Sequence, residues 1–492
     1  MAAELRPAHL DDWLDTLPYA NPGKSLELIL AALVETRAAH LKSSVRFELL
    51  DLYWLRYRFL LHVTVRPEPG RPSLAPAQRP LLLPKLRNVA LELGHGCAQT
   101  LRDAGVPTRN LATTLFRVGQ RQGRTSLLGI TAHAHALLLG FESYLPATED
   151  AWRELHGIFS LAESGMYLDE QLPDPDQPDR KTTSRQAYAR ICAYVLAQPS
   201  QLDPGAIWQA YDLLADWNQD IELSNYQPPI DPRGVFVIDP TRTPAPIDLR
   251  KVDPTAPTPR WLMLRCSRLA QRCNVELGRM AGQTGASILD QQRARTRLLE
   301  HLARLWGDAP RRRQPRRAAA GSVRIVSGIR DVHALFEAGG IGAAAGDSEQ
   351  SWQLLNSSEA GAALVTASAT AAPRIGELLA VRLGGSERWA AAVIRWLRLE
   401  PTGSYSVGTQ IISRSVRAAL LHAVTGSEFQ TQPRPALLLA AEGDQPEILL
   451  AAPGLYAPGQ RLQLTIGGQR QEVTADRVVE RSATFDRFCY TN

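Results

Sequence analysis

Residues 311–317, Arg-Arg-Arg-Gln-Pro-Arg-Arg, and residues 356–361, Asn-Ser-Ser-Glu-Ala-Gly, carry most of the information about this chain. The first stretch places five guanidinium groups in seven positions without a carboxylate. The second is an Asn-x-Ser-x-x-Gly element, rich in turn-forming residues, and the apolar run 362–365 follows it directly. An arginine segment followed by a turn and a strand predicts a β-rich domain with a positively charged patch near its start.

The region around these stretches has the apolar pattern of short strands. After Pro310 the apolar spacing changes from about 3.6 residues to about 2. Gly, Ser and Pro separate the runs, which is typical of a small antiparallel barrel. The predicted strands are 323–326, 362–365, 378–383, 389–396 and 406–412. Residues 414–424 are predicted to form a helix that closes this unit, and the glycine-rich residues 331–351 a flexible insertion.

The C-terminal tail has a second set of strand-like runs. These are 435–440, 448–451, 461–466 and 472–477. Gly467 and Gly468 lie between the last two runs and predict a hairpin turn. The tail is therefore interpreted as either a second small barrel or an extension of the first.

The first 305 residues are predicted to be mostly helical. Helices are expected at 85–104, 108–122, 125–144, 148–168, 182–197, 203–218, 259–281 and 284–306. Residues 234–239 predict a short strand, and the Pro- and Asp-rich residues 172–179 an exposed loop or hinge. The chain is thus a multidomain α + β protein. The predicted domains are a helical domain (1–172), a second helical region with a Pro-rich irregular insert (180–306), a barrel (307–424) and a C-terminal β domain or extension (430–492).

Composition places the chain among ordered proteins. It has 492 residues, of which 44% are hydrophobic and 21% charged, and a net charge of +5. No uncharged apolar run reaches the length of about 18 residues that a membrane span needs, and the N-terminus does not resemble a secretory signal. Five scattered cysteines fit reduced thiols, so a cytoplasmic location is predicted.

No residues indicate catalysis or metal binding. His133 and His135 are two apart, so on a helix they point in different directions, and no acidic ligands accompany them. Surface or capping positions are predicted for both. The glycine-rich segment at 339–346 lacks the strand and helix that a phosphate-binding loop requires. We therefore predict a protein that is not an enzyme, with no catalytic residues, no metal and no cofactor.

The two stretches that open this description resemble the signatures of the PilZ domain family, an Arg-x-x-x-Arg element followed by Asp/Asn-x-Ser-x-x-Gly. Two registers fit the first signature, Arg312/Arg316 and Arg313/Arg317, and the second matches a doubled arginine before the gap. The similarity covers about 310–424 and continues in 388–396, which ends in Arg-Trp, and in 406–412. Asn356 stands where the family usually has an acidic residue, and the two signatures are further apart than usual.

The resemblance implies an antiparallel β-barrel that binds the bacterial second messenger cyclic di-GMP. Guanidinium forks suit its phosphates and the O6/N7 edge of guanine. A micromolar complex needs about 8 kcal/mol, and a charge-assisted hydrogen bond contributes roughly 1.5–3 kcal/mol, so several contacts must converge. The implied ligand-binding residues are Arg312, Arg313, Arg317, Asn356, Ser358 and Gly361. The helical region would then transmit binding to an unknown protein partner.

Two other functions are compatible with the sequence. The chain could be a helical adaptor with a degenerate barrel that binds no ligand. Alternatively, it could bind nucleic acid or a ribosome through the basic patch, although that patch is short and few aromatic residues suited to stacking on bases flank it. Salt dependence distinguishes the latter, because polyanion binding weakens steeply with salt.

Overall fold

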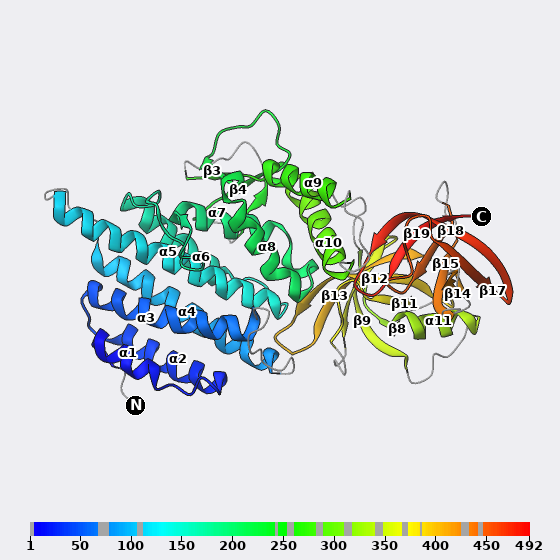
Figure 1. Cartoon of the computed structure of the whole chain (residues 1–492), viewed down its shortest axis with the longest axis horizontal. Coiled ribbons are helices and arrows are strands. Elements are labelled where there is room, and N and C mark those ends of the chain that lie inside the picture. Colours follow the sequence, from blue (N-terminus) through cyan, green and yellow to red (C-terminus); the bar gives the residue numbers. More distant parts are fainter. Residues whose placement is uncertain are drawn as a thin grey trace. The chain divides into compact units, whose positions relative to one another are not determined.

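The computed structural model describes residues 4–66, 78–105, 112–241, 245–252, 260–281, 289–308, 317–339, 348–366, 372–383, 386–424, 432–440 and 446–492 (Figure 1). It divides into two compact units. The first contains residues up to 199 with 204–279 and 299–310, and the second contains 200–203, 280–298 and 311–492. The first is mostly helical and the second mostly β, which confirms the predicted multidomain α + β class.

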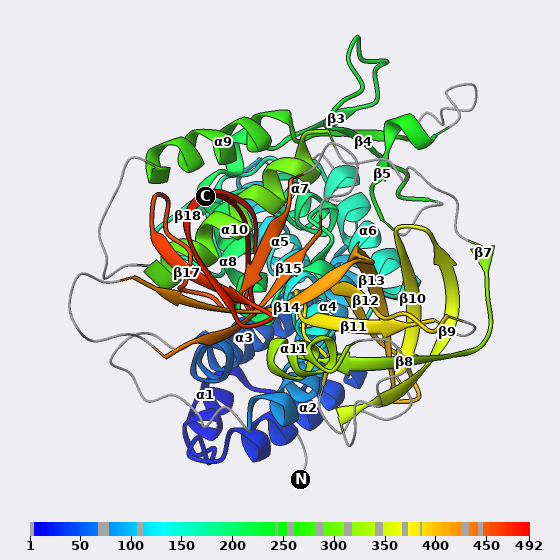
Figure 2. The same ribbon diagram turned by 90° about the vertical axis from the view of Figure 1, so that its right-hand side faces the viewer.

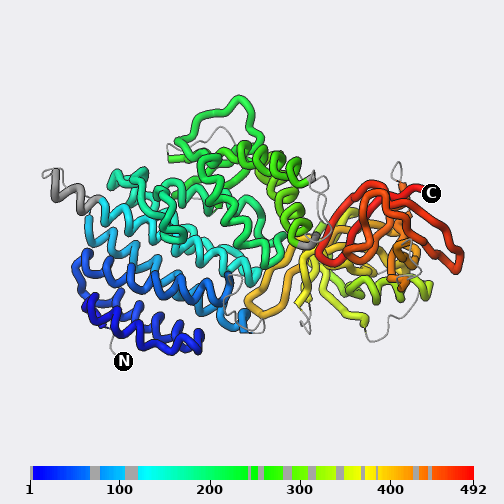
Figure 3. Tube along the Cα trace, in the orientation of Figure 1, coloured from blue at the N-terminus to red at the C-terminus, as the bar shows by residue number. Residues whose placement is uncertain are grey.

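Helices build most of the first unit, and several neighbours in sequence lie side by side (Figure 3). They bury apolar residues spaced three and four apart, such as Leu26, Ile29 and Leu33 of α2. The helices are α1 (Pro7–Asp15), α2 (Pro22–Ala38), α3 (Ser43–Val65), α4 (Arg79–Ala104), α5 (Ala112–Glu142), α6 (Glu149–Ser164), α7 (Ser184–Leu196), α8 (Pro204–Asp216), α9 (Ser267–Ala281) and α10 (Leu289–Trp306). Residues 289–298 of α10 belong to the second unit and 299–306 to the first. Among the described helices, none has both the length and the apolar character of a membrane span.

Helix α5 is continuous where the sequence predicts two helices, 108–122 and 125–144. Residues 108–111 lie outside the described residues. The predicted break falls near Gly123, but this glycine lies within the helix. A Cβ at this position would overlap the Glu170 carboxylate and crowd Leu172, so the glycine permits close packing and does not end the helix.

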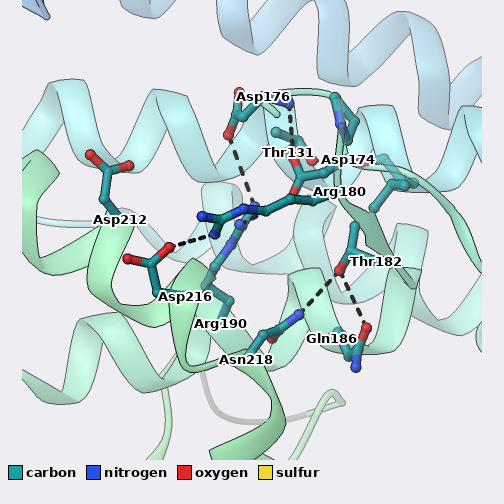
Figure 4. A network of polar contacts seen from close by, with 12 residues as sticks. Thr131, Asp174, Asp176, Arg180, Thr182, Gln186, Arg190, Asp212, Asp216 and Asn218 are labelled. Atoms are coloured by element: carbon teal, nitrogen blue, oxygen red, sulfur yellow. Dashed lines mark hydrogen bonds and ion pairs between the residues drawn. The ribbon is translucent and has the colours of Figure 1, made fainter. Parts of the chain in front are cut away.

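Residues 172–182 form a small hairpin that is tied into the helical core. Strand β1 (Leu172–Pro173) pairs with β2 (Lys181–Thr182). Between them, Asp174 accepts a hydrogen bond from Arg190 at 3.2 Å, and Figure 4 shows Asp174, Asp176 and Arg190 close together. Asp176 also lies 3.0 Å from His135. Burial opposes ionisation of Asp176, but His135 and Arg190 hold the pKa of this carboxyl well below its usual value. The predicted exposed loop or hinge at 172–179 is therefore correct only in part: Pro173, Pro178 and Asp179 are exposed, whereas Asp174 is buried, because paired carboxylates can be buried.

The two histidines of α5 are also buried, with 1% of His133 and 0% of His135 exposed. The prediction of surface or capping positions is therefore wrong. His135 contacts Asp176 through one ring nitrogen and Tyr57 through the other. His133 lies against Gly94 of α4, and burial lowers the pKa of its ring to about 3. In the described part of the chain, no group of His, Cys, Asp and Glu side chains is arranged to hold a metal ion.

A four-stranded antiparallel sheet completes the first unit. Its order is β3-β6-β4-β5, with β3 (Glu222–Asn225), β4 (Val235–Ile238), β5 (Ile247–Asp248) and β6 (Leu262–Arg265). Strand β4 confirms the strand predicted at 234–239. The helix predicted over 259–281 is partly wrong, since β6 precedes α9. The apolar run of β6 is too short for its period to distinguish a strand from a helix.

The first barrel of the second unit confirms the predicted antiparallel barrel (Figure 2). Its strand order is β10-β13-β12-β11-β8-β9, and pairing of β10 with β9 closes the ring. A short strand, β7, pairs with β9 as a seventh member. The strands are β7 (Arg317–Ala318), β8 (Ser322–Ser327), β9 (Gln350–Ser358), β10 (Gly361–Thr366), β11 (Leu378–Arg382), β12 (Ala390–Leu399) and β13 (Tyr405–Ser413).

The tail forms a second closed barrel, with order β14-β15-β16-β19-β18-β17. Its strands are β14 (Val416–Ala423), β15 (Arg434–Leu439), β16 (Ile448–Ala451), β17 (Arg461–Ile466), β18 (Gln469–Arg481) and β19 (Asp486–Thr491). Gly467 and Gly468 both have positive φ and form the predicted hairpin turn. The helix predicted at 414–424 is wrong. Its Ala- and Leu-rich residues form β14, because pairing with β15 and β17 overrides their helical propensity.

The two barrels share one apolar cluster. Helix α11 (Ile329–Glu337) contributes Val332 and Leu335 to this cluster. The flexible insertion predicted at 331–351 is therefore wrong for its first third, which is helical and packed. Residues 340–347 lie outside the described residues. Strands of both barrels contribute side chains, as does Phe485 from the β18–β19 turn. This sharing explains why β11 and β12 are apolar without alternation: one face fills the barrel and the other fills the seam.

Candidate functional site

The Asn-x-Ser-x-x-Gly element forms the tip of the β9–β10 hairpin. Asn356 is opposite Ala363 and Ser358 is opposite Gly361, so residues 359 and 360 form the turn. The fold thus brings the predicted residues Asn356, Ser358 and Gly361 together at one end of two paired strands.

Asn356 and Ser358 share one face of β9, because alternate residues of a strand point to the same side. The hydroxyl of Ser358 donates to the carbonyl of Gly361 at 3.3 Å. The Oδ1 atom of Asn356 is buried and has no hydrogen-bond partner among the described residues. A buried polar atom without a partner costs about 1–3 kcal/mol, so a donor on a ligand would stabilise this position.

A β-bulge precedes Asn356. Asn356 pairs with Ala363 and Leu354 with Leu364, which leaves Leu355 as the extra residue with 46% of its surface exposed. Bulges redirect side chains and often occur beside functional sites. Here the bulge places an exposed apolar side chain next to the unpartnered Asn356.

Gly361 is explained by the barrel itself. It pairs with Gln410 of β13, and a Cβ on Gly361 would overlap the backbone carbonyl of Thr409. Its φ is not positive. The glycine therefore allows β13 to approach β10 closely, and the motif combines a folding requirement with polar groups that are suited to binding.

The arginine stretch leads directly to this hairpin. Arg317 is opposite Ser357 and Ala318 is opposite Asn356 in an antiparallel pairing. The N-terminal end of β7, at Arg317, therefore points toward the hairpin turn. Arg312 and Arg313 lie outside the described residues.

A chain of polar contacts connects the far side of the hairpin with the second barrel. Gln410, opposite Gly361, accepts a hydrogen bond from Arg395 Nε at 2.8 Å. Arg395 belongs to the Arg-Trp pair at the end of 388–396. Its guanidinium also donates two hydrogen bonds to the Glu480 carboxylate of β18, of which the one from Nη2 measures 3.0 Å. Arg487 lies 3.2 Å from the same carboxylate. The face that carries the motif is thus tied to the C-terminal barrel.

The sequence did not single out Arg414, which also reaches the hairpin. Its guanidinium donates to the carbonyl of Glu359, in the turn, at 2.8 Å. The incorrect helix prediction for 414–424 concealed it. The signal was a lone arginine between two serines where one set of strands ends and the next begins.

These features define a class. A closed antiparallel barrel with an arginine segment paired to an Asn-x-Ser-x-x-Gly hairpin, preceded by a helical region, is a PilZ-containing protein.

Three family models match the chain in order along its length. They are the N-terminal domain of the cyclic-di-GMP receptor FimW at residues 8–229, its middle PilZ domain at 235–341 and 343–417, and the FimW C-terminal beta-barrel domain at 418–492. The chain therefore belongs to the family that these models describe, PilZ-containing proteins with a helical N-terminal region.

A relative is similar over nearly the whole chain. The cyclic-di-GMP receptor FimW of Pseudomonas aeruginosa is 22% identical, in an alignment that covers 98% of this chain and 90% of that protein. No solved structure matches the chain significantly.

Proposed function

We propose that this protein is a receptor for cyclic di-GMP, with Arg312, Arg313, Arg317, Asn356, Ser358 and Gly361 at the ligand site. The observation that carries this proposal is the pairing of Arg317 with the motif strand, opposite Ser357. It joins the arginine stretch to the Asn-x-Ser-x-x-Gly hairpin as the two signatures require. The names of the matching models and of the relative support the same ligand.

The remaining arginines are within reach of the hairpin. An extended chain spans at most about 3.3–3.6 Å per residue, so the Cα atoms of Arg312 and Arg313 lie within roughly 18 Å and 14 Å of that of Arg317. An arginine side chain extends this reach further. Several guanidinium groups can thus converge on the two phosphates of one ligand.

The two kinds of group have complementary tasks. Arginine forks bind phosphate oxygens or the O6/N7 edge of guanine. Asn356 presents an unpartnered buried acceptor, which suits an N–H group of the base. Ser358 adds a hydroxyl two positions along the same face. None of these roles involves covalent chemistry, so the proposed activity is binding and not catalysis.

The helical region is proposed as the output of the receptor, through an unidentified protein partner. A cytoplasmic location and the domain limits 1–172, 180–306, 307–424 and 430–492 also belong to the proposal, except that β14 (Val416–Ala423) is part of the second barrel and moves the limit between the barrels to residues 414–415. The proposed switch is electrostatic, since guanidinium groups that repel one another are held together by an anionic ligand.

Calorimetry with cyclic di-GMP tests the proposal. We expect micromolar or tighter binding by the wild-type protein and at least a tenfold loss for Arg313→Ala and for Asn356→Ala. The matched control is Arg434→Ala, which removes an exposed arginine at the start of β15 and should keep wild-type affinity.

The same titration distinguishes the other functions. No heat from the wild-type protein would favour the adaptor with a degenerate barrel. Weak binding that is lost steeply between about 50 and 200 mM salt, and is displaced by single-stranded RNA, would indicate a nucleic-acid-binding protein.

A further inference from the structure

Only two residues, Arg414 and Ser415, connect the first barrel to the second. Strand β13 ends at Ser413 and β14 begins at Val416. So short a connection cannot act as a flexible tether. The two strands that it joins determine its backbone conformation.

Hydrogen bonds from both barrels fix this connection. The buried hydroxyl of Ser413 donates to the carbonyl of Ser415 at 2.8 Å and accepts from the Ser415 amide at 3.1 Å. The amide of Ala440, after β15, donates to the same carbonyl at 3.0 Å. Arg414 therefore projects from a rigid backbone, which reduces the entropy lost when its side chain binds a ligand.

The exposed Arg414 is directed to the hairpin turn. Its guanidinium contacts the carbonyl of Glu359 at 2.8 Å, and the amide of Ile411 holds the carbonyl of Ala360 at 2.9 Å. Both carbonyls of the turn are thus bound from the β13 side. A guanidinium has five N–H donors in a planar fork, so the same group can hold a carbonyl and bind a phosphate oxygen.

Two cationic segments consequently flank the hairpin turn. Strand β7 begins at Arg317 along the β9 side of the hairpin, with its N-terminal end toward the turn. Strand β13 lies along the β10 side and ends toward the same turn, where Arg414 follows. An anion at the tip of the hairpin would meet positive charge from both sides.

We propose that Arg414 is a further ligand-binding residue, which contacts a phosphate of the cyclic dinucleotide from the side of the hairpin opposite Arg317. This inference rests on the proposed function. It makes the connection between the barrels part of the ligand site, so occupancy bears directly on the C-terminal barrel.

The alternative role for Arg414 is to stabilise the turn alone. Arg414→Gln removes the charge, and the melting temperature of this variant shows separately whether the hairpin turn has lost a stabilising contact. Arg414→Lys keeps the charge and loses the fork. The matched control is Arg417→Gln, which removes an exposed arginine three positions later, bound to Glu447 of the second barrel.

Dissociation constants for cyclic di-GMP and melting temperatures of the ligand-free proteins are measured for all four proteins. We expect Arg414→Gln to bind at least tenfold more weakly with an unchanged melting temperature. Arg414→Lys should lose less affinity, and Arg417→Gln none. Wild-type affinity in Arg414→Gln overturns the inference, and so does a loss accompanied by a lower melting temperature, which would assign Arg414 to hairpin stability. If the wild-type protein itself binds no cyclic di-GMP, the proposed function fails instead.

Discussion

Individual residues of the hairpin motif serve two different ends. Gly361 is required by the backbone of the neighbouring strand, whereas the buried Oδ1 of Asn356 has no hydrogen-bond partner within the described part of the chain. The sequence pattern alone does not separate these roles, since a glycine in a motif can serve either a ligand or the fold. The distance between strands β10 and β13 decides the question for Gly361.

Substitution of Gly361 by alanine should therefore damage the fold before it affects binding. The new methyl group meets the Thr409 carbonyl, and overpacking of this kind costs about 1–3 kcal/mol. Chemical denaturation should show this loss. The control, Gly157→Ala in α6, adds a methyl group that meets nothing within 4 Å and should be neutral or slightly stabilising. Unchanged stability of Gly361→Ala would show that the glycine serves the ligand.

At the scale of elements, the sequence predicted barrel strands well where apolar runs were bounded by turns. Strands β10–β13 and β15–β17 were all expected. Strand β14 was not, because its alanines and leucines favour a helix and only pairing with β15 and β17 makes it a strand. Helix α11 and the buried Asp174 were missed for a related reason. The position of α11 depends on the apolar cluster that the two barrels share, and that of Asp174 depends on Arg190. In both cases the partner is distant in the sequence.

The ligand site was predictable to a similar extent. The motif gave Asn356, Ser358 and Gly361, which the hairpin brings together, and β7 places Arg317 beside them. Arg414 could not be inferred, because its contact with the Glu359 carbonyl exists only once β13 and β10 have paired. A short sequence motif identifies residues that are close together in the sequence. Side chains contributed by a neighbouring strand or connection can be identified only when the pairing register of the strands is known.

The shared seam predicts that the two barrels are stabilised as one unit. Phe485 is fully buried there, and the hydroxyls of Ser482 and Thr484 both donate to the Gly376 carbonyl of the first barrel at 2.6 Å. Phe485→Ala should cost about 3–5 kcal/mol by denaturation and weaken the first barrel as well as the second. The control is Val479→Ala, an exposed position of β18, with a change below about 0.5 kcal/mol. Hydrogen exchange that accelerates in β14–β19 alone would contradict the idea of a single unit.

At the scale of the whole molecule, the buried histidines with a lowered pKa both lie in the helical unit. In the helical unit, burial lowers the pKa of His133 to about 3 and that of His301 to about 4. Burial raises the pKa of carboxyls in both units, those of Glu170 and Asp212 in the helical unit and those of Asp203, Glu377 and Asp486 in the barrel unit. The two units should therefore differ in their response to mild acid, because the lowered pKa values of the two histidines add an acid-sensitive contribution to the helical unit.

Whether acid stabilises or destabilises a unit depends on whether its folded or its unfolded state binds more protons. An unfolded histidine titrates near pH 6.5, about 3.5 units above His133 in the folded unit, so acidification between these values favours unfolding. The slope from His133 approaches about 1.4 kcal/mol per pH unit. For a carboxyl with a raised pKa, the folded state takes up the proton first, so acidification through that range favours folding.

Calorimetric scans from pH 7 to pH 5 test this contrast. We expect the melting temperature of the helical unit to fall while that of the barrel unit holds or rises, so the two transitions separate. Cyclic di-GMP should raise only the barrel transition, because a ligand stabilises the unit that binds it. His133→Leu should reduce the acid sensitivity of the helical transition, and the control His40→Leu, at an exposed position, should not. A parallel decrease of both transitions, or an acid response that His133→Leu leaves unchanged, would show that other groups govern the pH dependence.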